Sequence, residues 1–395
     1  MGSSPQAQFN DLVRGTVAVN TADDLKKKLA SGRPLRVKLG VDPTSPDIHL
    51  GHTVVLRKLR QFQDHGHQAV LIIGDFTALV GDPTGRSATR PQLTPQEVEA
   101  NAKTYFDQVG TVLDIPKLEI VRNSSWLKGL TFLELLKLGA RFTVAQFLER
   151  EDFHKRFTEK RPIGMHELFY PLMQAYDSVM VKADVEMGGN DQLFNLLAGR
   201  DLMRSEGLEA QVTLTMPLLA GLDGENKMSK SYGNHVGVAW SAREMFFGLM
   251  RVPDKLMKDY YTLLTSVPLD EADRLCDAGK THPKQAKVRL AIEIVRGYHG
   301  QDDADAAASQ WEREVSKGEL PVNLPELVVA PKIGLLDLVM LTKVPPSKSE
   351  GRRLIEQGGV EFEGAKITDP KKEMTLKGGE VLKAGKKAAF KLVVK

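Results

Sequence analysis

The sequence predicts an α/β protein: a doubly wound parallel sheet, followed by a helical region and a small α+β domain. Two strand–turn–helix units support this prediction. In the first, an alternating strand at 35–39 leads through a turn into an amphipathic helix at 54–62, and an apolar strand follows at 68–73. In the second, a short strand ends at Gly188-Gly189 and leads into a helix at 194–203. An unbroken apolar run such as 68–73 is typical of a parallel strand buried on both faces.

The remaining elements follow in chain order. A capped helix is predicted at 21–31, a helix with Pro95 in its first turn at 94–110, and a strand at 213–219. Residues 124–160 are helical by pattern and would connect the two halves of the sheet. Such a connection supplies either a dimer surface or core packing within its own subunit, through an apolar face made of Leu130, Phe132, Leu135, Leu136 and Leu138.

A chain of 395 residues is long enough for two or three domains. We expect a sheet domain over 1–235 with a helical insertion at about 124–165, a helical domain over 236–325, and a small domain over 333–395. The Pro-rich piece 320–326 is predicted to be a linker. The small domain holds 13 Lys and Arg against 8 Asp and Glu, whereas the rest holds 41 against 43, so the tail suits an anionic partner.

Composition excludes several other classes of protein. No apolar run approaches the roughly 18 residues of a membrane span. The first residues lack a basic region followed by an apolar core, so no secretory signal is expected. The single cysteine, Cys276, excludes an internal disulfide and a cysteine-based metal site. We therefore expect a cytoplasmic protein with no membrane partner.

Two basic stretches favour a phosphate ligand. His49 and His52 stand three residues apart at a helix start, on one face, where free N–H groups favour an anion; Gly51 lets a flat ligand approach the backbone. Far along the chain, Lys227–Ser231 places two lysines and two hydroxyls in a glycine-flanked loop, a plausible clamp for a polyphosphate. Alone, each stretch is also compatible with an ordinary helix end or surface loop.

Polar groups also gather on two other segments. Asp82 lies in a Gly- and Thr-rich loop that follows the strand at 68–73, at the sheet edge where ligands of such folds bind, and would suit an ammonium group. Tyr170, Gln174 and Asp177 fall at i, i+4 and i+7, so they share one face of a helix. For that helix alone, an ordinary solvated face is the simpler interpretation.

Together these motifs resemble those of bacterial tyrosyl-tRNA synthetases, which are class I aminoacyl-tRNA synthetases with a Rossmann-like catalytic domain. The match runs in order through Asp42–Thr44 with His49–His52, Gly81–Gly85, Tyr170/Gln174/Asp177 with Gly188–Gln192, and Lys227–Ser231. The resemblance implies activation of tyrosine by ATP and transfer to the 3′ end of tRNA(Tyr). The alternatives are a tryptophan–tRNA ligase, a non-catalytic RNA-binding protein on this scaffold, and a nucleotidyltransferase without a tRNA role.

The resemblance also implies roles for particular residues. The catalytic set would be Thr44, His49, His52, Lys227, Lys230 and Ser231. ATP would contact Asp42, His49, Gly51, His52, Gly189, Asp191 and Lys230. Tyrosine would contact Thr77, Asp82, Tyr170, Gln174, Asp177 and Gln192. Mg²⁺ would arrive bound to the phosphates of ATP, with no metal site on the protein itself.

One position departs from the family pattern. Many members have a tyrosine four residues before the aspartate of the Asp-Pro-Thr turn, where it contacts the substrate hydroxyl. Here that position is Lys38, predicted to lie at the end of the first strand. If its side chain points away from the pocket, Asp177 carries most of the discrimination; otherwise Lys38 reaches the hydroxyl or pairs with Asp177.

The tail resembles an RNA-binding module known from a small-subunit ribosomal protein. It would contain a short helix, a Gly358-Gly359 stop and a hairpin, and its RNA-binding residues would be Ser347, Lys348, Arg352 and Arg353. The helical domain before it would face the anticodon side. The expected partners are tRNA(Tyr), tyrosine, ATP and a second copy of the chain.

Overall fold

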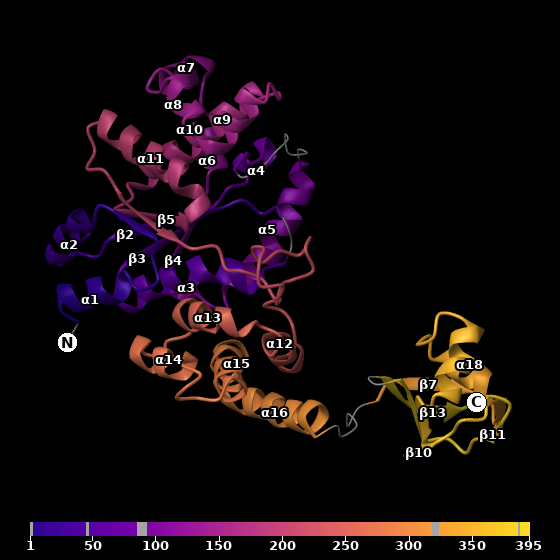
Figure 1. Ribbon diagram of the computed structural model, residues 1–395. Coiled ribbons are helices and arrows are strands. Elements are labelled where there is room, and N and C mark those ends of the chain that lie inside the picture. Colours follow the sequence, from indigo (N-terminus) through magenta and orange to yellow (C-terminus); the bar gives the residue numbers. More distant parts are fainter. Residues whose placement is uncertain (1–2, 45–46, 85–92, 318–323, 386–387) are drawn as a thin grey trace. The chain divides into compact units, whose positions relative to one another are not determined.

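The computed structural model describes residues 3–44, 47–84, 93–317, 324–385 and 388–395. The chain divides into two compact units, Met1–Ala308 and Ser309–Lys395 (Figure 1). Most of the predicted linker, 320–323, lies outside the described residues. No helix in the described ranges is long and apolar enough to cross a bilayer.

The first unit is built on a six-stranded sheet in the order β1-β6-β5-β2-β3-β4. Its strands are β1 (Ala18–Asn20), β2 (Arg36–Val41), β3 (Gln68–Ile73), β4 (Leu118–Arg122), β5 (Val185–Gly189) and β6 (Val212–Met216). Strands β2 to β6 are parallel, which confirms the doubly wound prediction. The sequence did not predict β4, nor β1, which pairs antiparallel with β6 at the edge. The strand order reverses between β2 and β5.

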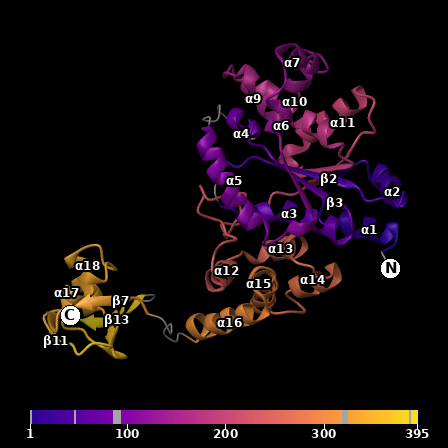
Figure 2. The same cartoon turned by 180° about the vertical axis from the view of Figure 1, so that it is seen from behind.

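Helices cover both faces of this sheet (Figures 1 and 2). On one face lie α10 (Met165–Val181) and α11 (Leu193–Ser205), and on the other lies α3 (Leu50–Asp64). The predicted caps are observed, because Thr21 caps α2 (Ala22–Ala30) and Thr94 caps α5 (Pro95–Val109). The remaining helices near the sheet are α1 (Pro5–Leu12) and the one-turn α4 (Thr77–Val80).

The connection between the two halves of the sheet is helical, as predicted. It contains α6 (Ser124–Leu127), α7 (Phe132–Gly139), α8 (Val144–Leu148) and α9 (Glu151–Thr158), which lie at one end of the unit (Figure 1). The apolar face expected there is divided. Leu138 is buried in a cluster with Phe147 and Phe153, whereas Phe132 is 76% and Leu136 51% exposed.

Helices also follow the last strand. They are α12 (Ala242–Leu249), α13 (Met257–Leu264), α14 (Leu269–Cys276), α15 (Pro283–His299) and α16 (Gln301–Trp311). They lie on the side of α3 away from α10 (Figures 1 and 2), and Tyr298 of α15 donates a 3.0 Å hydrogen bond to Thr53 of α3. The predicted boundary at 235/236 therefore lies within one compact unit.

The second unit is a small α+β domain with a five-stranded sheet in the order β10-β9-β12-β13-β7. Its elements are β7 (Glu326–Val329), β8 (Lys332–Gly334), α17 (Leu335–Leu341), α18 (Lys348–Glu356), β9 (Val360–Phe362), β10 (Ala365–Lys366), β11 (Glu373–Thr375), β12 (Val381–Ala384) and β13 (Ala388–Val394). Gly358, at φ +69°, follows α18 as expected of the glycine stop. Since β7 pairs with β13, the sheet begins before the predicted start at 333.

Candidate active site

Two adjoining cavities open at the carboxyl ends of β2 and β5, where the strand order reverses. Their volumes are about 320 and 420 Å³, and His52, Val55 and Gly189 line both. The chain around them is tied together, because Leu50 N–H donates to the carbonyl of Val236 at 3.0 Å. This pairing brings the turn that carries His49 and His52 beside the segment that follows Lys227–Ser231, which is called the lysine loop below.

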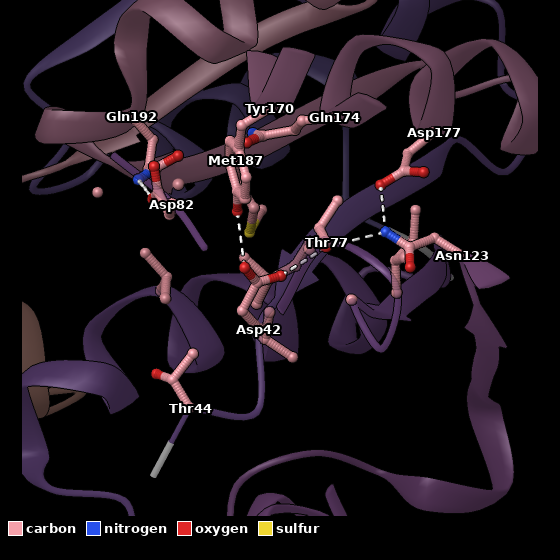
Figure 3. A pocket seen from close by; sticks show the side chains of 18 of the residues that line it. Asp42, Thr44, Thr77, Asp82, Asn123, Tyr170, Gln174, Asp177, Met187 and Gln192 are labelled. Atoms are coloured by element: carbon pink, nitrogen blue, oxygen red, sulfur yellow. Dashed lines mark hydrogen bonds between the residues drawn. The ribbon is translucent and has the colours of Figure 1, made fainter. Parts of the chain in front are cut away.

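The first cavity gathers the residues expected to bind the amino acid (Figure 3). Its lining includes Thr77, Asp82, Tyr170, Gln174, Asp177 and Gln192, and also Asp42 and Thr44. Asp42 was expected to contact ATP, but it lines this cavity and is not among the residues that line the second. Four distant segments of the chain therefore contribute to one site.

Asp177 stands at one end of this cavity with its carboxylate held by two donors. Trp126 Nε1 donates to Oδ1 at 2.8 Å, and Asn123 Nδ2 donates to Oδ2 at 3.2 Å. Burial raises the pKa of Asp177 to about 6, against the opposing effects of the Lys38 charge and the two hydrogen bonds. The carboxylate is therefore mostly ionised at neutral pH, and each oxygen keeps a lone pair for a ligand hydroxyl.

Asp42 lies between Tyr170 and Thr77 (Figure 3). It accepts hydrogen bonds from Tyr170 Oη at 2.9 Å and from Thr77 Oγ1 at 2.7 Å. Burial raises the pKa of Asp42 to about 7, and the charges of Asp82 and Asp177 act in the same direction. A Cβ at Gly74 would collide with Asp42 and Thr77, so only glycine fits there.

Asp82 holds the other side of the first cavity. Its Oδ2 accepts from Gln192 Nε2 at 2.8 Å, and its Oδ1 accepts from the backbone N–H of Thr84 at 2.9 Å. Together with Asp42 and Asp177, it makes the cavity acidic. Such a cavity favours a ligand that carries a cation and a hydroxyl.

The second cavity is formed by the start of α3, where the two histidine rings lie 3.8 Å apart between centroids. His49 Nδ1 accepts from Gly51 N–H and His52 Nδ1 accepts from His49 N–H, both at 3.2 Å. These bonds assign the proton to Nε2 in each ring. Burial lowers the pKa of His49 to about 3 and of His52 to about 4, helped by the positive charge of Lys230. Both are neutral donors at neutral pH.

The lysine loop closes the second cavity. Met228, 4% exposed, anchors the loop, and Ser229 N–H donates to Asn234 Oδ1 at 2.8 Å. Lys227 and Lys230 line the cavity, and Lys230 forms an ion pair with Asp47. Ser231 is exposed and is not among the residues that line either cavity; its hydroxyl lies 2.8 Å from that of Ser229.

Asp191 also lines the second cavity, as expected of an ATP contact. Burial raises the pKa of its carboxyl, and Lys227 opposes this rise. Across the described residues, no group of three or more His, Cys, Asp or Glu side chains is arranged to hold a metal ion.

Sequence reasoning missed three residues of the site: Asn123, Trp126 and Asp47. Asn123 directly follows β4, so recognition of 118–122 as a parallel strand would have placed it at the same edge of the sheet. For Trp126 and Asp47, the sequence offers no comparable signal.

The expected RNA-binding residues cluster around the start of α18. Arg352 and Arg353 are exposed on this helix. Ser347 is its N-cap, and its hydroxyl accepts from Glu350 N–H at 3.3 Å. Lys348 Nζ donates to Asp337 at 3.2 Å. The two arginines are therefore the side chains most available to an anionic partner.

Comparison with known proteins agrees with this geometry. A family model described as tRNA synthetases class I (W and Y) matches residues 30–316. The chain is 51% identical over 393 residues to a tyrosine–tRNA ligase of Moorella thermoacetica, covering 98% of this chain and 95% of the relative. For the tyrosine–tRNA ligase of Symbiobacterium thermophilum, the identity is 50% over 402 residues, covering 99% and 98%. A C-terminally truncated Aspergillus nidulans mitochondrial tyrosyl-tRNA synthetase shares the fold, with a TM-score of 0.64 and 24% identity over 79% of this chain and 94% of that chain.

Proposed function

Since this chain belongs to the class I tRNA synthetases of the tryptophan and tyrosine type, we infer that it uses ATP to activate tyrosine and attaches the product to tRNA. Relatives that match nearly the whole chain at 50–51% identity carry the name tyrosine–tRNA ligase, so the amino acid is tyrosine and not tryptophan. The observation that carries this function is the ionised, doubly held carboxylate of Asp177 at the end of an acidic cavity.

In this proposal, the first cavity binds tyrosine. Asp177 accepts the hydrogen bond of the phenol hydroxyl, while Asp82, Tyr170 and Gln174 hold the ammonium group. Phenylalanine would leave Asp177 without its ligand donor. A site built to hydrogen-bond a hydroxyl rejects the analogue that lacks it, and tyrosyl-tRNA synthetases are the standard example of this rule.

The second cavity would bind ATP with its Mg²⁺ on the phosphates. The tyrosine carboxylate attacks the α-phosphorus in line, a bond to the carboxylate oxygen forms, and the bond to pyrophosphate breaks. The nucleophile is already ionised, so no protein base is needed, and catalysis rests on alignment and charge stabilisation. The donors would be the Nε2–H groups of His49 and His52, which line the second cavity, and the hydroxyl of Thr44, which lines the first.

Two further groups would complete the nucleotide site. Lys227 and Lys230 would hold the departing pyrophosphate, and Asp191 would accept from the ribose hydroxyls. In the second step, a hydroxyl at the 3′ end of tRNA attacks the activated carbonyl, and AMP leaves.

The function is tested by pyrophosphate–ATP exchange with each of the twenty amino acids. Exchange should depend on tyrosine, with tryptophan and phenylalanine at least about a hundredfold lower in kcat/KM. Equal exchange with tryptophan would contradict the proposal, and so would an absence of exchange with all twenty.

We assign tRNA binding in part to the second unit, through Arg352 and Arg353. Truncation after Lys317 removes all the strands and the hydrophobic core of the small domain and leaves the first unit, Met1–Ala308, intact. Tyrosine activation should be unchanged, tRNA charging should fall about tenfold, and the remaining tRNA affinity should depend less on salt. Filter binding and charging assays at several salt concentrations measure this. Charging equal to that of the full chain would contradict the assignment.

We also propose that two copies associate through the exposed apolar side chains of the connection. Phe132, Leu133 and Leu136 are more than half exposed, as are Val144, Phe157 and Met165 nearby. Such a patch is typical of a protein interface. Sedimentation equilibrium should give a dimer, and Phe132→Asp with Leu136→Asp should shift it toward monomer. We expect the protein in the cytoplasm, where tRNA is charged.

A further inference from the structure

Lys38 is a buried charge whose partners are all within the protein. It lies in the middle of β2, not at its end, and its side chain is 1% exposed. Nζ donates to the carbonyl of Gln174 at 2.9 Å, to Ser178 Oγ at 2.7 Å and to Glu186 Oε1 at 2.8 Å. These three acceptors use all three ammonium protons. Lys38 is also not among the residues that line the first cavity. It therefore neither reaches a ligand hydroxyl nor bonds directly to Asp177.

Glu186 completes the pair from the neighbouring strand. Its side chain is 1% exposed in β5, and it accepts from Ser178 Oγ at 2.7 Å and from Gln211 Nε2 at 2.9 Å in addition to Lys38. The pair thus links β2 to β5 where the strand order reverses, close to the cavity. A buried ion pair with this many hydrogen bonds is costly to build and weak evidence for stability alone. Stability of the fold alone therefore does not account for the pair.

The contacts of the pair are concentrated on one turn of α10. Gln174 and Ser178 are four residues apart, so they lie on the same face of the helix, toward the sheet. Asp177 is adjacent to Ser178 within that turn. Lys38 bonds to both ends of the turn, so it fixes the segment that carries the hydroxyl acceptor.

We propose that the Lys38–Glu186 pair is a positioning device for tyrosine recognition, which acts through Asp177 by fixing its turn of α10 and by placing a positive charge near its carboxylate. The proposal rests on the function inferred above and adds residues that touch neither tyrosine nor ATP. It also explains why a lysine is compatible with this position of the fold.

The charges around Asp177 determine in which direction the Lys38–Glu186 pair changes its ionisation. The charged groups that act on Asp177 are Lys38 from β2, Glu186 from β5 and Asp42 after β2, and its hydrogen-bond donors are Asn123 and Trp126. Burial raises the pKa of Asp177, Lys38 lowers it more than Glu186 raises it, and the net effect of the pair is to favour the ionised carboxylate. Loss of both charges should therefore move the ionisation of Asp177 to higher pH.

The test uses the double variant Lys38→Met with Glu186→Gln in the full chain. Removing one partner alone would leave an unpaired buried charge, whereas the double variant keeps similar volumes and an acceptor for Ser178. A matched control is Arg156→Met with Glu167→Gln. This pair is also nearly fully buried, at 2% and 3% side-chain exposure, but it joins α9 to the first turn of α10. It reports the general cost of neutralising a buried ion pair.

The measurement is kcat/KM for tyrosine and phenylalanine in pyrophosphate–ATP exchange between pH 6 and 9. In the double variant, the tyrosine-to-phenylalanine ratio should fall about tenfold at pH 7, mainly through the KM for tyrosine, and return to within about twofold of wild type at pH 9. The KM for ATP and the phenylalanine rate should change less than about threefold. The control pair should leave the ratio unchanged at every pH.

Three outcomes would overturn the proposal. These are an unchanged ratio, a loss shared equally by tyrosine and phenylalanine, and a loss that does not recover at high pH. Failure of the proposed function would be seen separately, as a wild-type enzyme that does not exchange with tyrosine at all.

Discussion

The two cavities of the candidate active site differ in the charge of their side chains and in how firmly those side chains are held. In the first, the acidic side chains are buried and already bonded, as Asp177 is to Asn123 and Trp126. In the second, the basic groups lie at a helix end and on a loop, and Lys227 is exposed. Recognition of a ligand in its ground state requires side chains that are already held in position. Charge that develops on the phosphates only during the reaction requires donors that bind more strongly in the transition state than in the ground state.

Ionisation follows the same division. Burial raises the pKa values of Asp42 and Asp177 in the first cavity, whereas in the second it lowers those of His49 and His52. Both changes come from removal of water around a group that would be charged. The first cavity therefore titrates near neutrality, while the second keeps its histidines neutral well below it. Substitutions on the two sides should affect different kinetic constants.

The largest effect is expected from the lysine loop. Lys230→Ala should slow single-turnover adenylate formation by about 10² to 10³, because the lysine would stabilise charge present only in the transition state. Equilibrium binding of tyrosine should change less than about twofold. Lys280→Ala is the control, since Lys280 is also paired with an aspartate but belongs to neither cavity lining. Equal losses in binding and rate would erase the contrast between the cavities.

An intermediate effect is expected at Asp177. Asp177→Ala should lower the tyrosine-to-phenylalanine ratio of kcat/KM by about a hundredfold, because the acceptor is lost and Trp126 and Asn123 lose their partner. Asp177→Asn keeps the shape and a neutral amide oxygen, so a fall of about tenfold is expected. Competitive exchange assays measure both. An unchanged ratio in Asp177→Ala would remove this residue from discrimination.

Local patterns in the sequence predicted most of this arrangement. Each of these elements follows from residues that are close together in the sequence. Examples are the helix caps, the separate strands β2 and β3, and the shared face of Tyr170, Gln174 and Asp177. The short edge strand β1 has only three residues and no periodicity, and its partner lies almost 200 positions away. Such an element depends on tertiary pairing, which local propensity does not encode.

The same dependence on distant contacts explains what was missed around the first cavity. Strand alternation says that Lys38 points to one face of the sheet, but not which helix covers that face. Its contacts to Gln174 and Glu186 join residues about 140 positions apart. Asn123 and Trp126 reach Asp177 across about 50 residues, through a strand that the sequence did not reveal. The side chains that hold Asp177 in the first cavity are therefore the least predictable part of the site.

The smallest effect, and the most direct comparison of the cavities, is the response to pH. Burial raises the pKa of Asp42 to about 7 and that of Asp177 to about 6, so stability falls as pH rises from about 4, where these carboxyls ionise in the unfolded chain, and levels off above about pH 7. The ammonium and hydroxyl of tyrosine favour the ionised carboxylates. Tyrosine binding should therefore release a fraction of a proton near pH 6.5, measurable by calorimetry in buffers of different ionisation enthalpy.

Kinetics should show the same titration. Between pH 8 and 5.5, protonation of Asp177 with a pKa of about 6 should lower the tyrosine-to-phenylalanine ratio by about fourfold. The phenylalanine rate serves as the control, because it responds to Asp42 but has no hydroxyl for Asp177. His49 and His52, with pKa values of about 3 and 4, remain neutral over this range and should not change the KM for ATP. A constant ratio would contradict the role of Asp177 in discrimination. A KM for ATP that rises along with the KM for tyrosine would contradict the separate ionisation of the two cavities.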